Sequence, residues 1–308
     1  MISKIELQNA LENIYISPLE LCNLSCRYCY TKKTKNILSN NDILSFVERY
    51  KKVVPLKSIL FCGGEVFTKE EFPKLLNILN KQNIFTTIIT NGTIDHLKKI
   101  KNPANCQLLV SLDGPEKTHD FNRGPGNFKK TVRFIKKALS AGFFVEIMFL
   151  INKKSYPYRK TFEKYIADKI GRPVPLNYMT QKTKFYTVDH PLSNNKDISG
   201  ALNKKQILDI KKNFRSLPDK HFGCFQLSLQ SDGKIYGCCE SPIALANKDE
   251  SVKKIISKFK KSLSYCRTCS EKTCHGCCAP DFICGYNREF GFNCCKKTHR
   301  LLNTKTAR

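Results

Sequence analysis

Residues 14–29, with the sequence IYISPLELCNLSCRYC, place a short strand directly before three closely spaced cysteines. The segment 14–18 alternates in hydrophobicity and predicts a strand. Cys22, Cys26 and Cys29 then lie within eight residues on one loop. Three thiolates at this spacing can bind three irons of a [4Fe–4S] cluster and leave the fourth iron open to a small molecule. A zinc site is the alternative, but zinc prefers four ligands and no fourth Cys or His is nearby.

Strand-like and helix-like segments alternate from this strand to about residue 180. Nearly continuous apolar runs predict strands, and apolar positions at helical spacing predict helices between them. The predicted strands are 14–18, 58–61, 84–90, 107–112, 143–151 and 174–179, and the predicted helices are 41–53, 68–79, 94–101, 127–141 and 156–170. This alternation predicts an α/β fold, with a parallel sheet that is covered by helices and is either open or curled into a barrel.

The pattern changes near residue 181, where a second region begins. Residues 181–200 are polar and predict a linker, and residues 204–214 predict one more helix. From residue 221 the chain has many cysteines and few apolar runs, so we expect a small domain that metal clusters hold together. The predicted division is a 1–13 N-terminal segment, a 14–180 α/β domain, a 181–220 linker and helix, a 221–300 cysteine-rich domain and a 301–308 tail.

The composition limits the classes of protein that this chain can represent. It has 308 residues, of which 41% are hydrophobic, and this fraction is too high for a disordered chain. No apolar run is long enough to cross a membrane, and the N-terminus lacks the apolar stretch of a signal peptide. We therefore expect a cytoplasmic protein with no membrane contact. Disulfides are rare in that compartment, so the 16 cysteines indicate metal or iron–sulfur binding.

The strong positive charge allows two interpretations. The chain has 53 Lys and Arg against 26 Asp and Glu, a formal net charge of +27, and 42 of the basic residues are lysines. A compositionally biased genome produces such a lysine-rich surface without any function. A basic face for nucleic acid is the second interpretation, but the chain has no compact arginine-rich or aromatic-interleaved patch. The sequence therefore favours a protein without a nucleic-acid partner.

Two motifs make the chain similar to the radical S-adenosylmethionine (SAM) superfamily. The cysteine run fits the pattern C-x3-C-x-aromatic-C, with Tyr28 at the aromatic position. Gly63-Gly64-Glu65 directly follows the second predicted strand, where that family has a Gly-Gly-Glu motif. The resemblance implies a partial (βα)6 TIM-like barrel, followed by a small cysteine-rich iron–sulfur domain. It also implies that the active site lies at the carboxyl ends of the strands.

The resemblance implies cofactors and a reaction as well. A [4Fe–4S] cluster on Cys22, Cys26 and Cys29 would bind S-adenosyl-L-methionine at its open iron. Reductive cleavage of that molecule gives a 5′-deoxyadenosyl radical, which removes a hydrogen atom from the substrate. A protein such as a flavodoxin or ferredoxin would donate the electron. We therefore expect an enzyme, a radical SAM oxidoreductase or maturase.

The same resemblance assigns residues to the SAM site. Tyr28 matches the position beside the adenine, and Gly63-Gly64-Glu65 matches the edge that binds the amine. Ser111 matches a serine that reaches the ribose, and Arg123 matches an arginine that faces the cofactor. Two alternatives stay open. Ser111 and Asp113 are also suited to shape a turn at a strand end, and Arg123 is suited to an ion pair at the surface.

A second set of cysteines resembles the SPASM extension of this superfamily, which carries two auxiliary iron–sulfur clusters. The similarity rests on Cys224, on the spacing Gly233-x4-Cys238, and on Cys266-x2-Cys269-x4-Cys274-x3-Cys278, although two gaps are one residue short. The pairing of that pattern implies one cluster on Cys224, Cys238 and Cys278, and a second on Cys266, Cys269, Cys274 and Cys295. Cys294 is an alternative to Cys295, and Cys277 is an alternative to Cys278. A zinc ribbon is the alternative for residues 266–278.

Cys239 is predicted to be catalytic. Sulfatase-maturating members of this subfamily have an acidic base directly after the cysteine of the G-x4-C motif, and this chain has Cys239 there. A thiol can return a hydrogen atom to a carbon radical, as peptide epimerases of this kind require. The alternatives are an additional cluster ligand and an inert thiol. Cys62 and Cys106 are instead expected to be buried as small apolar residues.

The predicted substrate is a peptide or protein, because members of this subfamily mostly modify peptides, by epimerisation or cross-linking among other reactions. The thirteen residues before the first strand are too few for a leader-binding domain, so we expect a separate peptide-recognition protein or none. Two other classes stay open, namely an RNA-modifying radical SAM enzyme and a non-catalytic iron–sulfur electron carrier. Tyr28 and the Gly-Gly-Glu motif argue against the carrier, which needs no SAM site.

Overall fold

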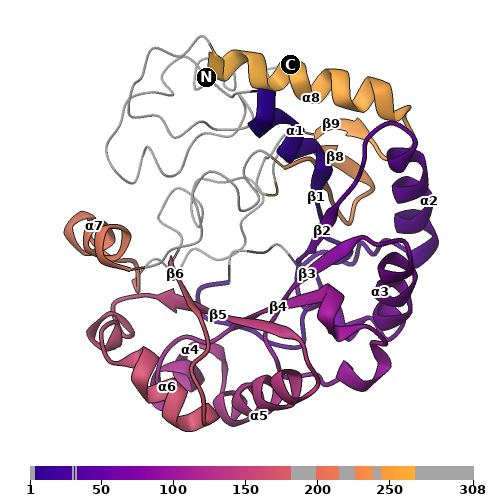
Figure 1. Ribbon diagram of the computed structural model, residues 1–308. Helices are drawn as coiled ribbons and strands as arrows, with labels where there is room; N and C mark the ends of the chain where they lie inside the picture. Colours follow the sequence, from indigo (N-terminus) through magenta and orange to yellow (C-terminus); the bar gives the residue numbers. More distant parts are fainter. Residues whose placement is uncertain are drawn as a thin grey trace.

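The computed structural model describes residues 4–29, 31, 33–181, 199–214, 226–237, 239 and 244–267. Within these residues, nine strands form one curved sheet in the order β6-β5-β4-β3-β2-β1-β7-β8-β9 (Figure 1). The strands are β1 (Asn13–Ile16), β2 (Ser58–Phe61), β3 (Phe85–Thr90), β4 (Cys106–Ser111), β5 (Phe144–Ile151), β6 (Leu176–Thr180), β7 (Ser228–Leu229), β8 (Lys234–Tyr236) and β9 (Ala244–Asn247).

The strands β1 to β6 pair in parallel, each with the next strand along the chain. A parallel pair of consecutive strands needs a crossover connection, and helices form most of these crossovers. The described helices are α1 (Lys4–Glu12), α2 (Asn40–Lys51), α3 (Phe72–Lys81), α4 (Glu116–Arg123), α5 (Asn127–Ser140), α6 (Phe162–Ile170), α7 (Lys204–Asn213) and α8 (Val252–Arg267). The predicted α/β fold with a partial TIM-like barrel is therefore confirmed.

The helices α2, α3, α5 and α6 lie along the outer side of the curved sheet (Figure 1). Each buries one stripe of side chains at helical spacing, as the periodicity predicts. In α5, for example, Phe128, Phe134 and Ile135 are almost fully buried. These side chains form one continuous apolar core with strand residues such as Val110 and Ile147. The core holds the strands in place. Because β1 to β6 are parallel, their carboxyl ends lie along one edge of the sheet.

Several predicted helix boundaries differ from the structure. The helix predicted to start at Thr68 begins at Phe72, because residues 66–68 form a 3-10 turn that the Glu65 side chain caps. The predicted helix 94–101 is wrong, since only residues 97–99 form a 3-10 turn there. Residues 156–158 form a separate 3-10 turn before α6. The helix α4 was not predicted, because its sequence EKTHDFNR has no apolar stripe.

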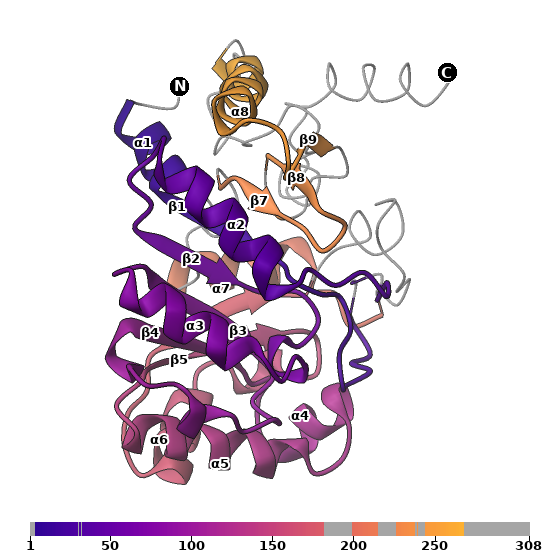
Figure 2. The same ribbon diagram turned by 90° about the vertical axis from the view of Figure 1, so that its right-hand side faces the viewer.

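The sheet continues beyond β1 into the segment 226–247, for which the sequence predicts no strands. The strand β7 pairs in parallel with β1, and β8 and β9 follow as antiparallel neighbours. Arg49 of α2 donates hydrogen bonds to the carbonyl oxygens of Lys248 and Glu250. Lys248 in turn forms a 3.0 Å ion pair with Asp42. This part of the chain is therefore fastened to the barrel (Figure 2).

The helix α8 packs beside β9 and has one apolar side and one charged side. Its apolar residues Val252, Ile255 and Phe259 are buried, while Lys253 and Lys260 are exposed. These two lysines therefore lie on the solvated face of the helix. None of the helices in the described residues is both long and apolar enough to span a membrane.

Candidate active site at the carboxyl ends of the strands

The cysteine loop and the Gly-Gly-Glu loop are joined by backbone hydrogen bonds. The amide of Gly64 donates to the carbonyl oxygen of Leu19 at 3.0 Å, and the amide of Glu65 donates to that of Leu21 at 2.9 Å. A Cβ atom at Gly63 would lie 2.1 Å from the Leu19 oxygen, and one at Gly64 would lie 1.9 Å from the Leu21 oxygen. Only glycine permits such a close approach. The two glycines therefore bring the two loops into contact.

The three cysteines of this loop fit an iron–sulfur cluster by their chemistry. Cys22, Cys26 and Cys29 are half-buried and are not in disulfides. Burial raises the pKa of the Cys26 thiol to about 11, and burial also raises the pKa of Cys22. Buried thiols of this kind ionise when a metal binds, because the metal charge stabilises the thiolate. The donor set is therefore suited to a metal cluster and poorly suited to a nucleophile.

A single metal ion is a poorer match for these residues. No three His, Cys, Asp or Glu side chains in the described part of the chain are grouped as ligands of one ion. In a [4Fe–4S] cluster each cysteine binds a different iron, so the sulfurs need not converge on one point. The cluster on these three cysteines stays a prediction, and zinc stays its alternative.

Glu65 is fully buried between two loops and accepts three hydrogen bonds. The donors are the amide of Phe67 at 3.2 Å, the hydroxyl of Thr90 at 2.8 Å and the amide of Asn91 at 2.6 Å. Burial raises the pKa of Glu65, although these bonds oppose the change. All three donors are uncharged, so the negative charge of the carboxylate is left for a cation. An ammonium group of a ligand would satisfy it.

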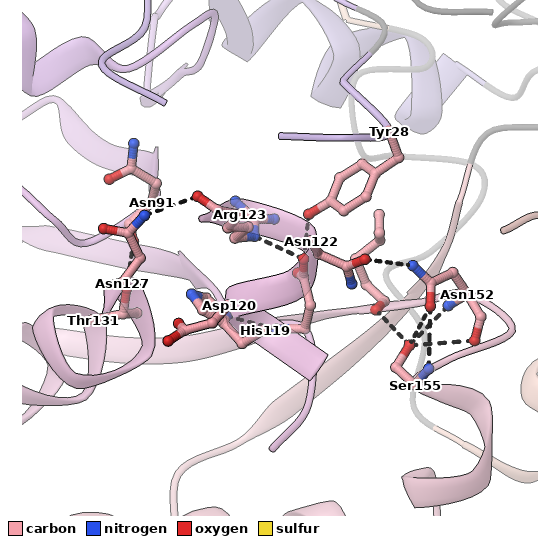
Figure 3. A network of polar contacts seen from close by, with 12 residues as sticks. Tyr28, Asn91, His119, Asp120, Asn122, Arg123, Asn127, Thr131, Asn152 and Ser155 are labelled. Atoms are coloured by element: carbon pink, nitrogen blue, oxygen red, sulfur yellow. Dashed lines mark hydrogen bonds and ion pairs between the residues drawn. The ribbon is translucent and has the colours of Figure 1, made fainter. Parts of the chain in front are cut away.

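A triad of Tyr28, Asp113 and Arg123, centred on the fully buried Asp113, ties the cysteine loop to the end of β4. The Tyr28 hydroxyl donates to Oδ2 of Asp113 at 2.5 Å, and Nε of Arg123 donates to the same oxygen at 2.9 Å (Figure 3). The Arg123 guanidinium also lies 5.5 Å from the centre of the Tyr28 ring. Burial raises the pKa of Tyr28, so its hydroxyl stays protonated as a donor. Burial opposes the charge of Arg123, but Asp113 raises the pKa of the guanidinium and keeps it cationic.

The structure brings most of the predicted SAM-site residues to one edge of the barrel. Tyr28, Gly63-Gly64-Glu65 and Arg123 lie on loops or helix ends that follow β1, β2 and β4. Ser111 is the last residue of β4 and is buried. Arg123 does form an ion pair, and its partner is Asp113. The pair does not lie at the surface, because the two side chains are 10% and 0% exposed. The contacts of these residues with ligand groups stay a prediction.

Three further polar residues at this edge were not predicted. His119 and Asn122 lie on α4, the helix that the sequence analysis missed, and Asn91 follows β3. Among the described residues, Oδ1 of Asp113, Nε2 of His119 and Nδ2 of Asn122 are buried without a hydrogen-bond partner. Such atoms in a native structure call for a water or a ligand. The only signal in the sequence was their place after strands of a parallel sheet.

His119 is held as a neutral ring that accepts a hydrogen bond. The amide of Asp113 donates to its Nδ1 at 3.2 Å, so the proton of the neutral ring is on Nε2. Burial is the main cause that lowers the pKa of His119, to about 4. At neutral pH the ring therefore supports the turn after β4 without adding a positive charge beside Arg123.

We expect this burial to make the free energy of unfolding fall as the pH is lowered from about 6.5 to about 4. In that window the unfolded chain binds a proton at His119 and the folded chain does not, so stability rises with pH and is fully present above about 6.5. The effect is roughly 3 kcal/mol at most. Urea denaturation of His119→Asn at several pH values should show a flatter profile than wild type. His96→Asn, at a half-buried histidine, is the control, and an equally steep profile in His119→Asn would contradict the prediction.

The other predicted cysteines are only partly described. Cys239 is half-buried in a turn after β8, and its carbonyl oxygen accepts a 3.2 Å hydrogen bond from Gln230. Its role as a hydrogen-atom donor stays a prediction. Cys106 is buried as expected, whereas Cys62 is only half-buried. The side chain of Cys266, on the last turn of α8, is not described, and the remaining predicted ligands lie outside the described residues, namely Cys224, Cys238, Cys269, Cys274, Cys278 and Cys295, as do the alternatives Cys277 and Cys294.

A cysteine loop, a buried carboxylate and a largely buried arginine lie together at the carboxyl edge of the partial barrel, so the class is an α/β barrel domain with a polar site at that edge. Comparison with known families agrees with this class. Residues 16–163 match the family model described as "Radical SAM superfamily". This stretch is therefore similar to a radical SAM superfamily domain, and it includes the three cysteines, the Gly-Gly-Glu motif and Arg123.

The relatives and the solved structures extend the comparison. Fe-coproporphyrin III synthase of Methanosarcina barkeri is 34% identical in an alignment of 143 residues, and the match covers 44% of this chain and 35% of that protein. GTP 3′,8-cyclase of Staphylococcus haemolyticus is 25% identical in an alignment of 287 residues, and the match covers 78% of this chain and 82% of that protein. The structure of anSMEcpe with bound AdoMet and Cp18Cys peptide has a TM-score of 0.65 at 19% identity, over 96% of this chain and 99% of that one. The likeness to anSMEcpe shows the fold, and the chain spans about a third of the length of the synthase.

Proposed function

We propose that this protein is a radical SAM enzyme that cleaves S-adenosylmethionine reductively and removes a hydrogen atom from a peptide or protein. The observation that carries the proposal is the contact between the cysteine loop and the Gly-Gly-Glu loop. It brings the loop that carries three thiols against the loop of a buried carboxylate whose hydrogen-bond donors are all uncharged. An iron–sulfur electron carrier has no use for that carboxylate.

Different residues of the site would bind the cluster and S-adenosylmethionine. Cys22, Cys26 and Cys29 would hold the [4Fe–4S] cluster, which with S-adenosylmethionine supplies a 5′-deoxyadenosyl radical when both are bound. Glu65 would bind the amine, because its charge is uncompensated by its own partners. Arg123, which lies next to the Tyr28 ring, would face the carboxylate of the methionine part.

The triad sets the shape of this site before a ligand binds. Asp113 fixes both Tyr28 and Arg123, so neither side chain has to be ordered by the cofactor. The amide of Arg27 donates to the carbonyl oxygen of Asn122 at 3.0 Å and adds a backbone tie between the cysteine loop and α4. Preorganised groups of this kind contribute to affinity because less conformational freedom is lost on binding.

The peptide substrate and two auxiliary clusters are the finer part of the proposal. They are supported by the spacing of Cys266, Cys269, Cys274 and Cys278, and by the fold shared with a structure that holds AdoMet and a peptide. The electron donor would be a flavodoxin or ferredoxin, and Cys239 would return a hydrogen atom in an epimerisation. Cyclisation of GTP is a second candidate, because the match to the GTP 3′,8-cyclase covers most of both chains.

Anaerobic assays of the reconstituted protein test the proposal. With dithionite and S-adenosylmethionine, we expect slow formation of 5′-deoxyadenosine and methionine even without a substrate. Addition of GTP should leave this rate unchanged, whereas short peptides encoded beside the gene should increase it. A cluster that can be reduced but gives no cleavage of S-adenosylmethionine would contradict the proposal that the protein is an enzyme. Acceleration by GTP alone would replace the peptide substrate with the nucleotide.

A further inference from the structure

Asn91 occupies a central position at the end of β3. It is buried, with 6% of its surface exposed, and it contacts three separate segments of the chain. Its amide donates to Oε2 of Glu65 at 2.6 Å. Its carbonyl oxygen accepts from the Thr131 hydroxyl at 2.9 Å (Figure 3). Its side-chain nitrogen donates to Oδ1 of Asn23 at 2.9 Å and lies 3.9 Å from the sulfur of Cys22. The backbone amide, the backbone carbonyl and the side-chain nitrogen of Asn91 are therefore all hydrogen-bonded.

The orientation of the Asn91 side chain is fixed by its partners. Its Oδ1 accepts from the amide of Thr93 at 2.9 Å and from the Thr93 hydroxyl at 2.6 Å. A backbone amide can only donate, so the atom that faces it must be the oxygen. The amide nitrogen consequently faces the cysteine loop. It has two hydrogens, of which one serves Asn23 and the other points to Cys22.

Cys22 thus has two N–H donors in this structure. One is the amide of Leu24, at 3.4 Å from the sulfur, and the other is the side chain of Asn91. As a thiol, Cys22 can itself donate weakly to Oδ1 of Asn23, at 4.0 Å. As a ligating thiolate it loses that hydrogen and keeps both N–H donors. The site is therefore arranged for the ionised form of the sulfur.

We propose that Asn91 is a positioning residue that hydrogen-bonds the Cys22 thiolate and raises the reduction potential of the cluster on Cys22, Cys26 and Cys29. This inference rests on the proposed function, because it needs that cluster. Reduction adds negative charge, part of which lies on the sulfurs, and an N–H donor stabilises the reduced form more than the oxidised form. Hydrogen bonds to cluster sulfurs are among the factors that set such potentials.

The same residue connects the cluster to the predicted amine site. The backbone of Asn91 holds Glu65, and its side chain holds Cys22 and Asn23. Thr131 fastens Asn91 from the opposite side, out of contact with the sulfur. Asn91 therefore adds a second connection between the sulfur and the carboxylate, beside the backbone hydrogen bonds that join the two loops.

The test is a reductive titration of the reconstituted full chain, followed by electron paramagnetic resonance. The spectrum of the Cys22/Cys26/Cys29→Ala variant is subtracted to remove signals of any other cluster. Asn91→Asp keeps the shape of the side chain, but it removes the donor and adds a negative charge. At a fixed potential we expect the ratio of reduced to oxidised cluster to fall about tenfold, which corresponds to about 59 mV for a one-electron couple. Thr86→Val, at the amino end of β3 beside Cys106, is the matched control and should titrate like wild type.

The outcomes separate this inference from the proposed function. A titration curve of Asn91→Asp that coincides with that of wild type would overturn the role of Asn91 while leaving the cluster in place. If Asn91→Asp binds no cluster, Asn91→Ala decides the question, because it removes the donor without adding charge and should also titrate at a lower potential than wild type. A wild-type protein that binds no cluster on the three cysteines would reject the proposed function itself. Circular dichroism checks that each variant is folded.

Discussion

Replacement of Cys22, Cys26 and Cys29 together by alanine is expected to abolish the formation of 5′-deoxyadenosine. The three thiols are the described ligands of the proposed cluster, and removal of all of them leaves no iron beside Glu65. The variant should lose about four irons per chain relative to wild type, because one [4Fe–4S] cluster is gone. Iron analysis and chromatography of the reaction products measure the two effects.

Cys106→Ala is the control for this variant. Cys106 is the first residue of β4, so it lies at the amino end of a strand, away from the candidate site. Its sulfur accepts hydrogen bonds from Asn80 and Thr86, which makes its role structural. The control should lose some thermal stability but keep its iron and its activity. A triple variant with undiminished iron or with residual cleavage at the wild-type rate would contradict the assignment.

The second large effect is expected from Arg123→Met. The Arg123–Asp113 ion pair is 2.9 Å long, and its two side chains are 10% and 0% exposed. Removal of the cation leaves a buried carboxylate with Tyr28 as its remaining side-chain donor, and such a loss destabilises a protein by about 3–5 kcal/mol. Urea denaturation should show this decrease. The double variant Arg123→Met/Asp113→Leu should recover part of it, because the unpaired charge is then gone.

A more exposed pair in the same chain provides the comparison. Arg159 and Asp209 are 2.7 Å apart, and their side chains are 20% and 24% exposed. Water compensates a charge that loses its partner at such a site, so Arg159→Met should cost about 1 kcal/mol or less. Equal losses for Arg123→Met and Arg159→Met would show that burial of the triad has no energetic consequence. In Arg123→Met we also expect weaker binding of S-adenosylmethionine in equilibrium dialysis.

The local sequence predicted the elements whose signals are short-range. All six strands from β1 to β6 lie within two residues of their predicted ranges, because continuous apolar runs mark strands that are buried on both faces. The cysteine loop was recognised because its ligands lie close together in the sequence. The helix α4 escaped prediction because it packs through His119 and Asn122, which have no apolar periodicity.

The sequence by itself therefore determined the order of strands and helices, the cysteine loop and the glycines beside it. Only the tertiary structure decided which of these residues touch. It placed Asp113 against Tyr28, a residue 85 positions away, and Asn91 against Cys22, 69 positions away. It also placed the Glu65 carboxylate where it accepts a hydrogen bond from the segment that follows β3. Such contacts depend on which strands are neighbours in the sheet, and the packing of the whole apolar core determines that order.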